Sequence, residues 1–429
     1  MLDFLDFSFL DALDILLVAT LIYYIYKLLK GTVAINIFLG IAFIFLIWKI
    51  TQILKMEMLS NILGYLLSGG VIALIIVFQQ EIRKFLLMIG TTNVTSRTQF
   101  LKQLKFLKSE ITLETDSDTL LSVRALEILN DKSLAFAANN GVFGLYNPNK
   151  DSWVTSKQEF DTLNLQFRAV AHTSSDFFML SIESPALLYK TGDTGKMQLV
   201  YKEGNQKSFY DAMRFWNDQE GIAIGDPTED CLSIIITRDG GKTWKKMSCS
   251  DLPKSNEGEA AFAASNSNIA IIGEETWIAT GGKSSRILYS PNKGKTWQAF
   301  NTPITKGLPT TGMYSIDFYD ALNGFAIGGD YTKPDDNKDN KIVTNDGGKT
   351  WQIVAENENP GYRSCVQYLP NRAGKELVAI GFKGIDFSND GGYHWKHLSD
   401  EGFYTVRFLN DSVAYAAGSG KISKLIFKE

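Results

Sequence analysis

The sequence predicts two structural classes in one chain of 429 residues: a transmembrane module of three helices, followed by an all-β propeller of seven blades. Three apolar runs before residue 80 each approach the ~20 residues that a membrane-spanning helix needs. Beyond them, short strand-like segments repeat at a period of roughly 40 to 56 residues, which is typical of propellers. We expect three helices in 1–78, a juxtamembrane helix and linker in 79–119, and the propeller in 120–429.

The apolar runs cover about residues 9–29, 33–50 and 59–78. A cleavable signal peptide explains the first run poorly, because the tail before it holds Asp3 and Asp6 but no basic residue, and two more runs follow. After the third run, residues 78–90 place apolar side chains at helical spacing, which predicts an amphipathic juxtamembrane helix. A lipid bilayer is therefore an expected partner, and self-association through this module stays open.

Basic residues predict the orientation of the module. The first loop carries Lys27 and Lys30, and the segment after the third run begins with Arg83 and Lys84. Placing both on the inside gathers most Lys and Arg in the cytoplasm, although the second loop also holds lysines. This places the propeller in the cytoplasm.

Bulk composition excludes several functions. The net charge of −4 gives no electrostatic case for nucleic acid. Cys231, Cys249 and Cys365 are too few and too scattered for a disulfide framework or a zinc site, so we expect buried or idle thiols. No phosphate-cradling glycine loop is present in the sequence, and we expect no cofactor and no metal.

Seven segments read as the first strands of blades, and a short apolar second strand follows each one. They are SVRALEIL, QFRAVAHT, AMRFWND, EAAFAAS, SIDFYDA, CVQYLPN and TVRFLND. Seven blades span about residues 122–427, with six or eight as alternatives. Because the last blade lacks an outer strand, we expect residues near the N-terminal end of the propeller to close it.

A polar turn ending in Trp recurs as RDGGKTW, NKGKTW, NDGGKTW and NDGGYHW. Its Asp or Asn is placed to accept backbone hydrogen bonds, its glycines tolerate positive φ, and its Trp offers an apolar face to the gap between blades. We interpret these turns as structural. Their residues are Asp239, Gly241, Trp244, Asn292, Gly294, Trp297, Asp346, Gly348, Trp351, Asp390, Gly392 and Trp395.

The candidate binding residues lie in the first strands, at positions that the repeat alignment treats as equivalent. They are Arg124, Arg168, Arg214, Gln367 and Arg407. Such arginines should converge on one level of the central channel and form a recognition ring for an acidic protein segment or a small anion. Pairing between blades, with backbone carbonyls or acids such as Asp317, is the structural alternative.

The front of the chain resembles a known family. The segments LDILLVATLIYYIYKLLKGT and GVIALIIVFQQEIRKFLLMIG are similar to the three-span module of bacterial membrane-bound diadenylate cyclases, and the likeness runs to about Thr119. Members continue into a domain that makes cyclic di-AMP from two ATP molecules, marked by Asp-Gly-Ala and Arg-His-Arg motifs. Neither tripeptide occurs in this sequence. The resemblance implies a multi-pass protein of the bacterial inner membrane.

The remainder resembles Asp-box propellers of the sialidase-like superfamily and, more closely, propellers of the photosystem II assembly factor type. Sialidase chemistry needs an arginine triad, a Tyr nucleophile with a Glu partner, and an acid/base Asp, and no spacing here marks such a set. Exported relatives imply a periplasmic propeller, against the cytoplasmic side that the basic residues favour.

The sequence therefore favours a membrane-anchored binding or assembly protein without catalysis of its own. Diadenylate cyclase and sialidase-like hydrolase are the alternatives. The junction near residue 119 has two open explanations: a natural fusion that uses the membrane module as an anchor, or a misassembled reading frame.

Overall fold

The computed structural model describes residues 47–49, 51–54, 56, 58–59, 105–111, 121–147, 152–192 and 195–428. The three expected membrane spans lie outside these residues, apart from a few positions at the end of the second and the start of the third. Among the described residues, no helix is long and apolar enough to cross a membrane. The chain divides into two compact units, Met1–Gln103 and Leu104–Glu429.

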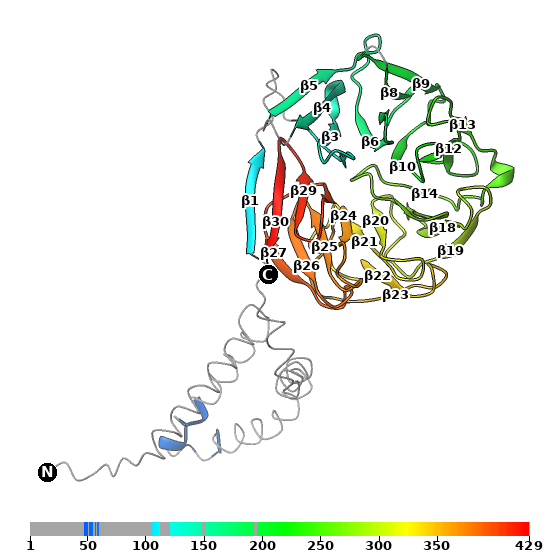
Figure 1. Cartoon of the computed structure of the whole chain (residues 1–429). Coiled ribbons are helices and arrows are strands. Elements are labelled where there is room, and N and C mark those ends of the chain that lie inside the picture. The colour runs from blue at the N-terminus through cyan, green and yellow to red at the C-terminus, as the bar shows by residue number, and fades with distance from the viewer. Residues whose placement is uncertain are drawn as a thin grey trace. The chain divides into compact units, whose positions relative to one another are not determined.

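Seven antiparallel sheets stand around a ring, so the predicted seven-bladed propeller is confirmed (Figure 1). Blades 1 to 3 contain β2 (Ala125–Ile128), β3 (Leu134–Ala137), β4 (Val142–Asn147), β5 (Ser152–Lys157), β6 (Phe167–His172), β7 (Phe177–Ser181), β8 (Ala186–Thr191), β9 (Met197–Glu203), β10 (Tyr210–Phe215), β11 (Gly221–Gly225), β12 (Ser233–Thr237) and β13 (Lys245–Lys246). Two 3₁₀ turns are η1 (Asn139–Gly141) and η2 (Cys249–Asp251).

The later blades follow the same order. Blades 4 and 5 contain β15 (Ile269–Ile272), β16 (Glu275–Ala279), β18 (Arg286–Ser290), β19 (Gln298–Asn301), β20 (Thr311–Phe318), β21 (Gly324–Asp330), β22 (Lys341–Thr344) and β23 (Gln352–Ile353), with β14 (Glu259–Ala260) and β17 (Gly281–Gly282) on the edge of β20. Blades 6 and 7 contain β24 (Cys365–Tyr368), β25 (Leu377–Gly381), β26 (Gly384–Ser388), β27 (Lys396–Ser399), β28 (Thr405–Phe408), β29 (Val413–Ala417) and β30 (Ile422–Lys428).

The ring closes through β1 (Lys105–Ile111), which supplies the outer strand of blade 7. It pairs antiparallel with β30, from Lys105 opposite Lys428 to Ile111 opposite Ile422, and the two strands lie side by side in Figure 1. This confirms the expected closure from the N-terminal side. The closing strand lies within 79–119, the segment that we expected to be a juxtamembrane helix and linker.

The core lies between the blades. One buried cluster joins Phe178 of blade 2 to Met213 and Trp244 of blade 3, and similar clusters occupy the other gaps. The first strands of neighbouring blades contact one another around the central axis, while outer strands such as β5 are exposed. Aliphatic residues on the second strands, as in the fully buried β11 and β25, supply most of this apolar surface.

One expected strand is wrong. EAAFAAS was predicted to be the first strand of blade 4, but the strand there is β15, which we had expected to be the second, and β16 pairs with it. Only Glu259–Ala260 of the predicted segment is extended, as β14. Apart from Phe262, the residues that follow are small or polar, and they include Asn266 at φ 56°, a left-handed conformation that interrupts a strand.

We predict that proline in β1 opens the ring. Two single variants, Lys108→Pro and Ser109→Pro, test the prediction. Alternate N–H groups of an antiparallel edge strand point toward the partner strand, so one of these two neighbouring N–H groups faces β30 and the other does not. The variant whose N–H faces β30 should lose about 2–3 kcal/mol of unfolding free energy, and its neighbour less. Urea unfolding of the full chain, followed by tryptophan fluorescence, gives both values. Equal, unchanged stabilities would contradict closure by β1.

Candidate functional site

A buried loop of residues 261–268 crosses the centre of the propeller; we call it the channel segment. Ser265, Asn266 and Asn268 have no solvent exposure. Where this segment passes, the first strands of the other blades bond to it instead of to water. The channel segment therefore determines which side chains of the first strands have partners within the protein and which remain available to a ligand.

The channel segment bonds to every other blade. Its contacts with blades 1, 2 and 3 are Arg124 Nη1 to the Ala264 carbonyl (3.4 Å), Asn266 Nδ2 to the Val170 carbonyl (2.7 Å) and the Met213 N–H to Asn266 Oδ1 (2.9 Å). Its contacts with blades 5, 6 and 7 are Ser267 Oγ with Ser315 Oγ (2.8 Å), Ser265 Oγ to the Ser364 carbonyl (2.6 Å) and Thr405 Oγ1 to the Ser265 carbonyl (2.9 Å).

The five predicted ring residues fall on two levels. In blades 2 and 3 the pairing shifts after Phe167 and after Tyr210, so Arg168 occupies the same bulge position as Asp211. Arg214 lies three residues further along its strand, about 10 Å away at 3.3 Å per residue. The repeat alignment had placed Arg168 and Arg214 at equivalent positions. It was out of register by three residues, so it did not reveal that the two arginines lie on different levels.

The lower level joins Arg214 and Arg407 to a carboxylate that we had not singled out, Glu127. Glu127 is 6% exposed, and its Oε1 lies 2.9 Å from Arg214 Nη1 and 3.7 Å from Arg407 Nε, while its Oε2 lies 3.2 Å from His172 Nδ1. Burial raises the pKa of Glu127, but Arg214, His172 and Arg407 outweigh it, and the net pKa is lowered. Glu127 therefore stays ionised and neutralises part of this level.

Arg407 is 5% exposed and is held by protein oxygens. Its Nη2 donates to the Asn266 carbonyl at 2.9 Å, and its Nη1 donates to the Val406 carbonyl at 2.8 Å. Gln367, at the same position in β24 as Arg407 in β28, is half-buried, and its Oε1 has no hydrogen-bond partner among the described residues. The lower level is thus largely satisfied within the protein.

The upper level contains Arg124 and Arg168. The Arg124 guanidinium lies 4.0 Å from the centre of the Tyr404 ring, and its buried Nε has no hydrogen-bond partner in the described structure. Arg168 has one long contact, from Nη2 to Gln166 Oε1 at 3.5 Å. Burial lowers the pKa of Arg168, and the like charge of Arg124 lowers it further. Within the described part of the chain neither arginine forms an ion pair.

Asp211, beside this level, does not neutralise the arginines. It is fully buried, its carboxyl group has no side-chain hydrogen-bond partner among the described residues, and burial raises its pKa well above the usual range although the Ala263 N–H lowers it. The next acid, Asp226, has its pKa raised to about 6 by burial. A protonated Asp211 is no counter-ion for Arg168; the Glu183 carboxylate acts on Arg168 through its charge but forms no ion pair with it among the described residues.

An aromatic wall borders the same mouth on blades 5 and 6. Phe262 of the channel segment stacks on Tyr314 at 3.9 Å, Tyr314 contacts Tyr362 at 4.7 Å, and Tyr362 contacts Phe382 at 5.4 Å. Phe382 is 40% exposed and neighbouring Tyr331 48%. Burial, the largest influence, raises the pKa of Tyr362, while nearby Arg124 lowers it. Tyr362 therefore lies close enough to Arg124 for the two side chains to interact electrostatically.

Sequence reasoning missed Glu127, Asp211, Tyr404 and Asn266. Glu127 stands three residues after Arg124 in SVRALEIL, so an acidic residue close in sequence to a predicted ring residue was a readable signal. Nothing local marks Asp211, because its role depends on a β-bulge that the sequence does not announce.

The four Asp-box turns share one geometry, shown by the third copy. Asp346 Oδ1 accepts from the Thr350 N–H at 3.0 Å, and the Thr350 hydroxyl donates to Asp346 Oδ2 at 2.6 Å. The Gly348 N–H donates to Thr344 Oγ1 at 3.0 Å. Trp351 is buried among Trp277 and Ile342, between blades 4 and 5. These turns lie away from the channel, and their Asp or Asn side chains bond to groups of the same turn.

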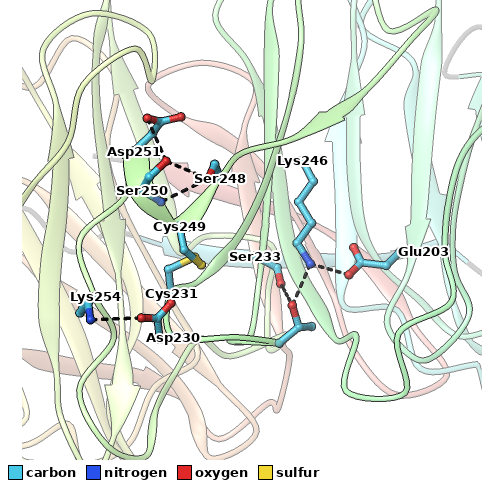
Figure 2. Close-up of a disulfide and its surroundings, with 11 residues drawn as sticks. Glu203, Asp230, Cys231, Ser233, Lys246, Ser248, Cys249, Ser250, Asp251 and Lys254 are labelled. Atoms are coloured by element: carbon cyan, nitrogen blue, oxygen red, sulfur yellow. Dashed lines mark hydrogen bonds and ion pairs between the residues drawn. A yellow bond between two sulfur atoms is a disulfide. The ribbon is translucent and has the colours of Figure 1, made fainter.

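Two of the cysteines form a disulfide, which corrects the expectation of idle thiols. Cys231 and Cys249 are joined with their Cα atoms 5.5 Å apart, just before β12 and at the start of η2 (Figure 2). Beside them Lys246 bonds to Glu203 and, at 2.8 Å, to Thr228 Oγ1. Cys365 is free and buried. Cys231 and Cys249 are 18 residues apart, a spacing that does not by itself mark a disulfide in the sequence.

Comparison with known proteins separates the two parts of the chain. Residues 3–82 match the family of the CdaA N-terminal transmembrane domain, and residues 235–246 match the BNR/Asp-box repeat. Cyclic di-AMP synthase CdaA from Bacillus subtilis is 34% identical over 88 residues, which are 20% of this chain and 32% of that protein. The matched segment thus spans about a third of that relative.

The propeller is similar in fold to solved structures. A structure described as YCF48 bound to D1 peptide superposes with a TM-score of 0.56 at 12% identity, covering 77% of this chain and 97% of that one. The GH74 xyloglucanase from Xanthomonas campestris gives 0.52 at 12% identity, covering 75% and 53%. At such identities the likeness shows the fold alone. The resemblances stated from the sequence are confirmed, and the membrane assignment of the front rests on the family match.

We predict a pH dependence from Asp226, whose Oδ1 accepts from the Ala261 N–H at 2.8 Å at the start of the channel segment. Its pKa is raised from 3.8 to about 6 because the folded protein favours the protonated carboxyl group. This contribution to the unfolding free energy is present at pH 4 and is lost as the pH rises through 6 and Asp226 ionises. Asp226→Asn should match the parent at pH 4 and gain up to about 3 kcal/mol over it at pH 7.

Urea unfolding at the two pH values measures this gain. Asp336→Asn, on an exposed hairpin tip, is the control and should show no such change. Because Asp211 and Asp317 also have raised pKa values, only the difference between variant and parent reports on Asp226. A difference that does not change with pH would contradict the assignment.

Proposed function

We propose that this chain is a membrane-anchored binding protein without catalysis of its own, and that its propeller captures an acidic polypeptide segment at the upper mouth of the channel. The carrying observation is the pair Arg124 and Arg168, adjacent and half-buried, with no ion pair among the described residues. Two uncompensated guanidinium groups in a partly desolvated mouth favour an incoming carboxylate.

The aromatic wall supports a polypeptide rather than a small inorganic anion. Phe382 and Tyr331 expose apolar surface beside the arginines, which a free anion would leave unused. A segment with an acidic side chain or terminal carboxylate next to an apolar residue fills both parts of the mouth. The related structure described as bound to D1 peptide is consistent with a peptide ligand on this fold.

The proposal narrows the ring that we expected from the sequence to two residues. Arg214 and Arg407 bond to Glu127 and to carbonyls of the channel segment, so they contribute chiefly to joining the blades. Replacing Arg407 would leave Glu127 with one fewer partner in a buried place and would destabilise the fold. Gln367 lies on the same lower level and is left out because its amide carries no charge to attract a carboxylate.

Binding of a synthetic peptide tests the proposal. The probe is a fluorescein-labelled dodecamer of alternating Glu and Phe or Leu residues with a free carboxyl end, titrated into the full chain in detergent. Arg124→Gln with Arg168→Gln should weaken binding at least tenfold, and affinity should fall with added salt. Lys242→Gln with Lys349→Gln removes the same charge from exposed Asp-box positions and should leave the affinity unchanged.

Equal affinity of the arginine variant and the parent would contradict the proposal, as would equal weakening by the lysine pair. The thermal unfolding midpoint of each variant shows whether it is folded. A peptide with Gln in place of Glu should bind no more tightly to the parent than to the arginine variant.

We further propose that the propeller faces an oxidising compartment outside the cytoplasm. The Cys231–Cys249 disulfide supports this side, because cytosolic thiols are kept reduced. It favours the periplasmic alternative over the cytoplasmic side that the basic residues predicted. The lysines of the second loop, Lys49 and Lys55, are the part of the charge pattern that fits this orientation.

Thiol trapping in cells decides the side. Cells are quenched in acid and the denatured protein is treated with a maleimide–polyethylene glycol reagent, with and without prior reduction. We expect one modified thiol, Cys365, before reduction and three after it. The Cys365→Ser variant should then show none before reduction. Three modified thiols without reduction, together with an inactive C-terminal alkaline phosphatase fusion, would place the propeller in the cytoplasm.

A further inference from the structure

Two gaps between neighbouring blades are built from equivalent sequence segments, but different side chains occupy them. The loop FWNDQEG of blade 3 corresponds to FYDALNG of blade 5, and the turn RDGGKTW corresponds to NDGGKTW. The next blade in each pair contributes NKGKTW or NDGGYHW. Position by position, the gap between blades 3 and 4 can therefore be compared with the gap between blades 5 and 6.

Long charged side chains fill the gap between blades 3 and 4. Arg238 lies 5.2 Å over the Trp216 ring, and its Nη1 donates to Glu220 Oε1 at 2.8 Å. Lys293 Nζ donates to the other oxygen of Glu220 at 2.7 Å, and Arg238 Nη2 donates to the Lys293 carbonyl. A stacked and ion-paired network leaves this gap occupied by the protein itself.

Shorter residues stand at the same positions between blades 5 and 6. Asn345 replaces Arg238, Asn323 replaces Glu220, and Gly391 replaces Lys293. A cavity of about 410 Å³ opens there, a volume suited to a small organic ligand. The sequence differences thus account for the cavity.

Three tyrosines line the cavity. Tyr368 is 8% exposed, and its ring lies 5.9 Å from that of Tyr319, which is 38% exposed. Tyr393, on the Asp-box turn of blade 6, is 51% exposed and stands where the blade 4 turn has Lys295. Two partly exposed aromatic rings beside a buried one offer apolar surface to a ligand that keeps polar edges.

The polar lining offers mainly neutral groups. The side chains of Asn345 and Gln352 have no hydrogen bond within the described chain, and the same holds for the Lys375 ammonium. The carboxylates are already engaged: Asp320 accepts from Asn323 Nδ2 and from two backbone N–H groups, and Asp390 bonds to His394. One ammonium and two amides do not make an anion site, and no free carboxylate is left for a cation.

We infer that the cavity between blades 5 and 6 binds a neutral saccharide ring. A pyranose has apolar C–H faces that pack on tyrosine rings, and hydroxyl groups that both donate to and accept from amide side chains. This ligand uses the tyrosines, Asn345 and Gln352 together. The site lies on the loops that carry the Asp-box turns and is separate from the arginine pair at the channel.

Saccharide binding by the full chain tests the site. The probes are glucose, N-acetylglucosamine and their β-1,4-linked tetramers, measured by saturation-transfer difference NMR and isothermal titration. At least one probe should bind, and Tyr393→Ala should weaken it at least tenfold. The matched control is Lys295→Ala, the equivalent position of blade 4, which should leave binding unchanged.

A filling variant tests the same cavity without removing an aromatic ring. Asp320→Asn, Asn323→Glu, Asn345→Arg and Gly391→Lys together copy the blade 3 and 4 network, in which Asn217 Nδ2 donates to Glu220 at 2.9 Å, and should abolish binding with the unfolding midpoint retained. Lysine at position 391 requires a left-handed backbone, which Lys293 adopts at φ 55° and Gly391 at φ 81°. No binding of any probe to the parent, or binding that survives the filling variant, would overturn the inference.

Arg124→Gln with Arg168→Gln should bind the saccharide as the parent does. A loss of saccharide binding in that variant, with Tyr393→Ala unchanged, would place the sugar at the channel and also overturn the inference.

Discussion

The structure depends on how seven blades share the polar groups of one buried loop. The channel segment 261–268 carries backbone and side-chain groups into a place without water, and each unsatisfied group there would cost about 1–3 kcal/mol. Ser265, Asn266 and Ser267 meet this requirement by bonding to first strands on opposite sides of the axis. The propeller is consequently joined at its centre as well as around its rim, where β1 completes blade 7.

This constraint separates structural from available arginines. Side chains at the level of the segment's carbonyls, Arg214 and Arg407, are drawn into hydrogen bonds and into the pair with Glu127. Arg124 and Arg168, one level away, keep only long or stacking contacts. Four arginines that look equivalent in the sequence thus divide into two that join the blades and two that form no ion pair among the described residues.

The repeats made the blade count predictable from sequence, because turns such as NDGGKTW and the apolar second strands are local patterns. The level of each arginine was not predictable, because a bulge at Arg168 and Asp211 shifts the register without changing the apolar pattern. EAAFAAS reads as a strand by its apolar residues, yet only Glu259–Ala260 is a strand, and the small residues Ala263, Ala264 and Ser265 are buried in the channel segment. The disulfide could not be read from two cysteines 18 residues apart, since pairing depends on how the chain returns.

The membrane module and the propeller meet earlier in the sequence than we expected. The family match ends at residue 82, and the closing strand begins at Lys105, so any boundary falls between them instead of near 119. β1 precedes the expected junction and completes blade 7, so the propeller begins before residue 119.

The unfolding free energy of Asn266→Gly tests the central role of the channel segment most directly. Glycine keeps the left-handed backbone at φ 56° and removes only the side chain that bonds to Val170 and Met213. Asn357→Gly, at φ 57° on an exposed turn, is the matched control. We expect a loss of about 2–4 kcal/mol for Asn266→Gly and a few tenths for the control. Equal small losses in both variants would show that the segment merely occupies the channel and does not join the blades.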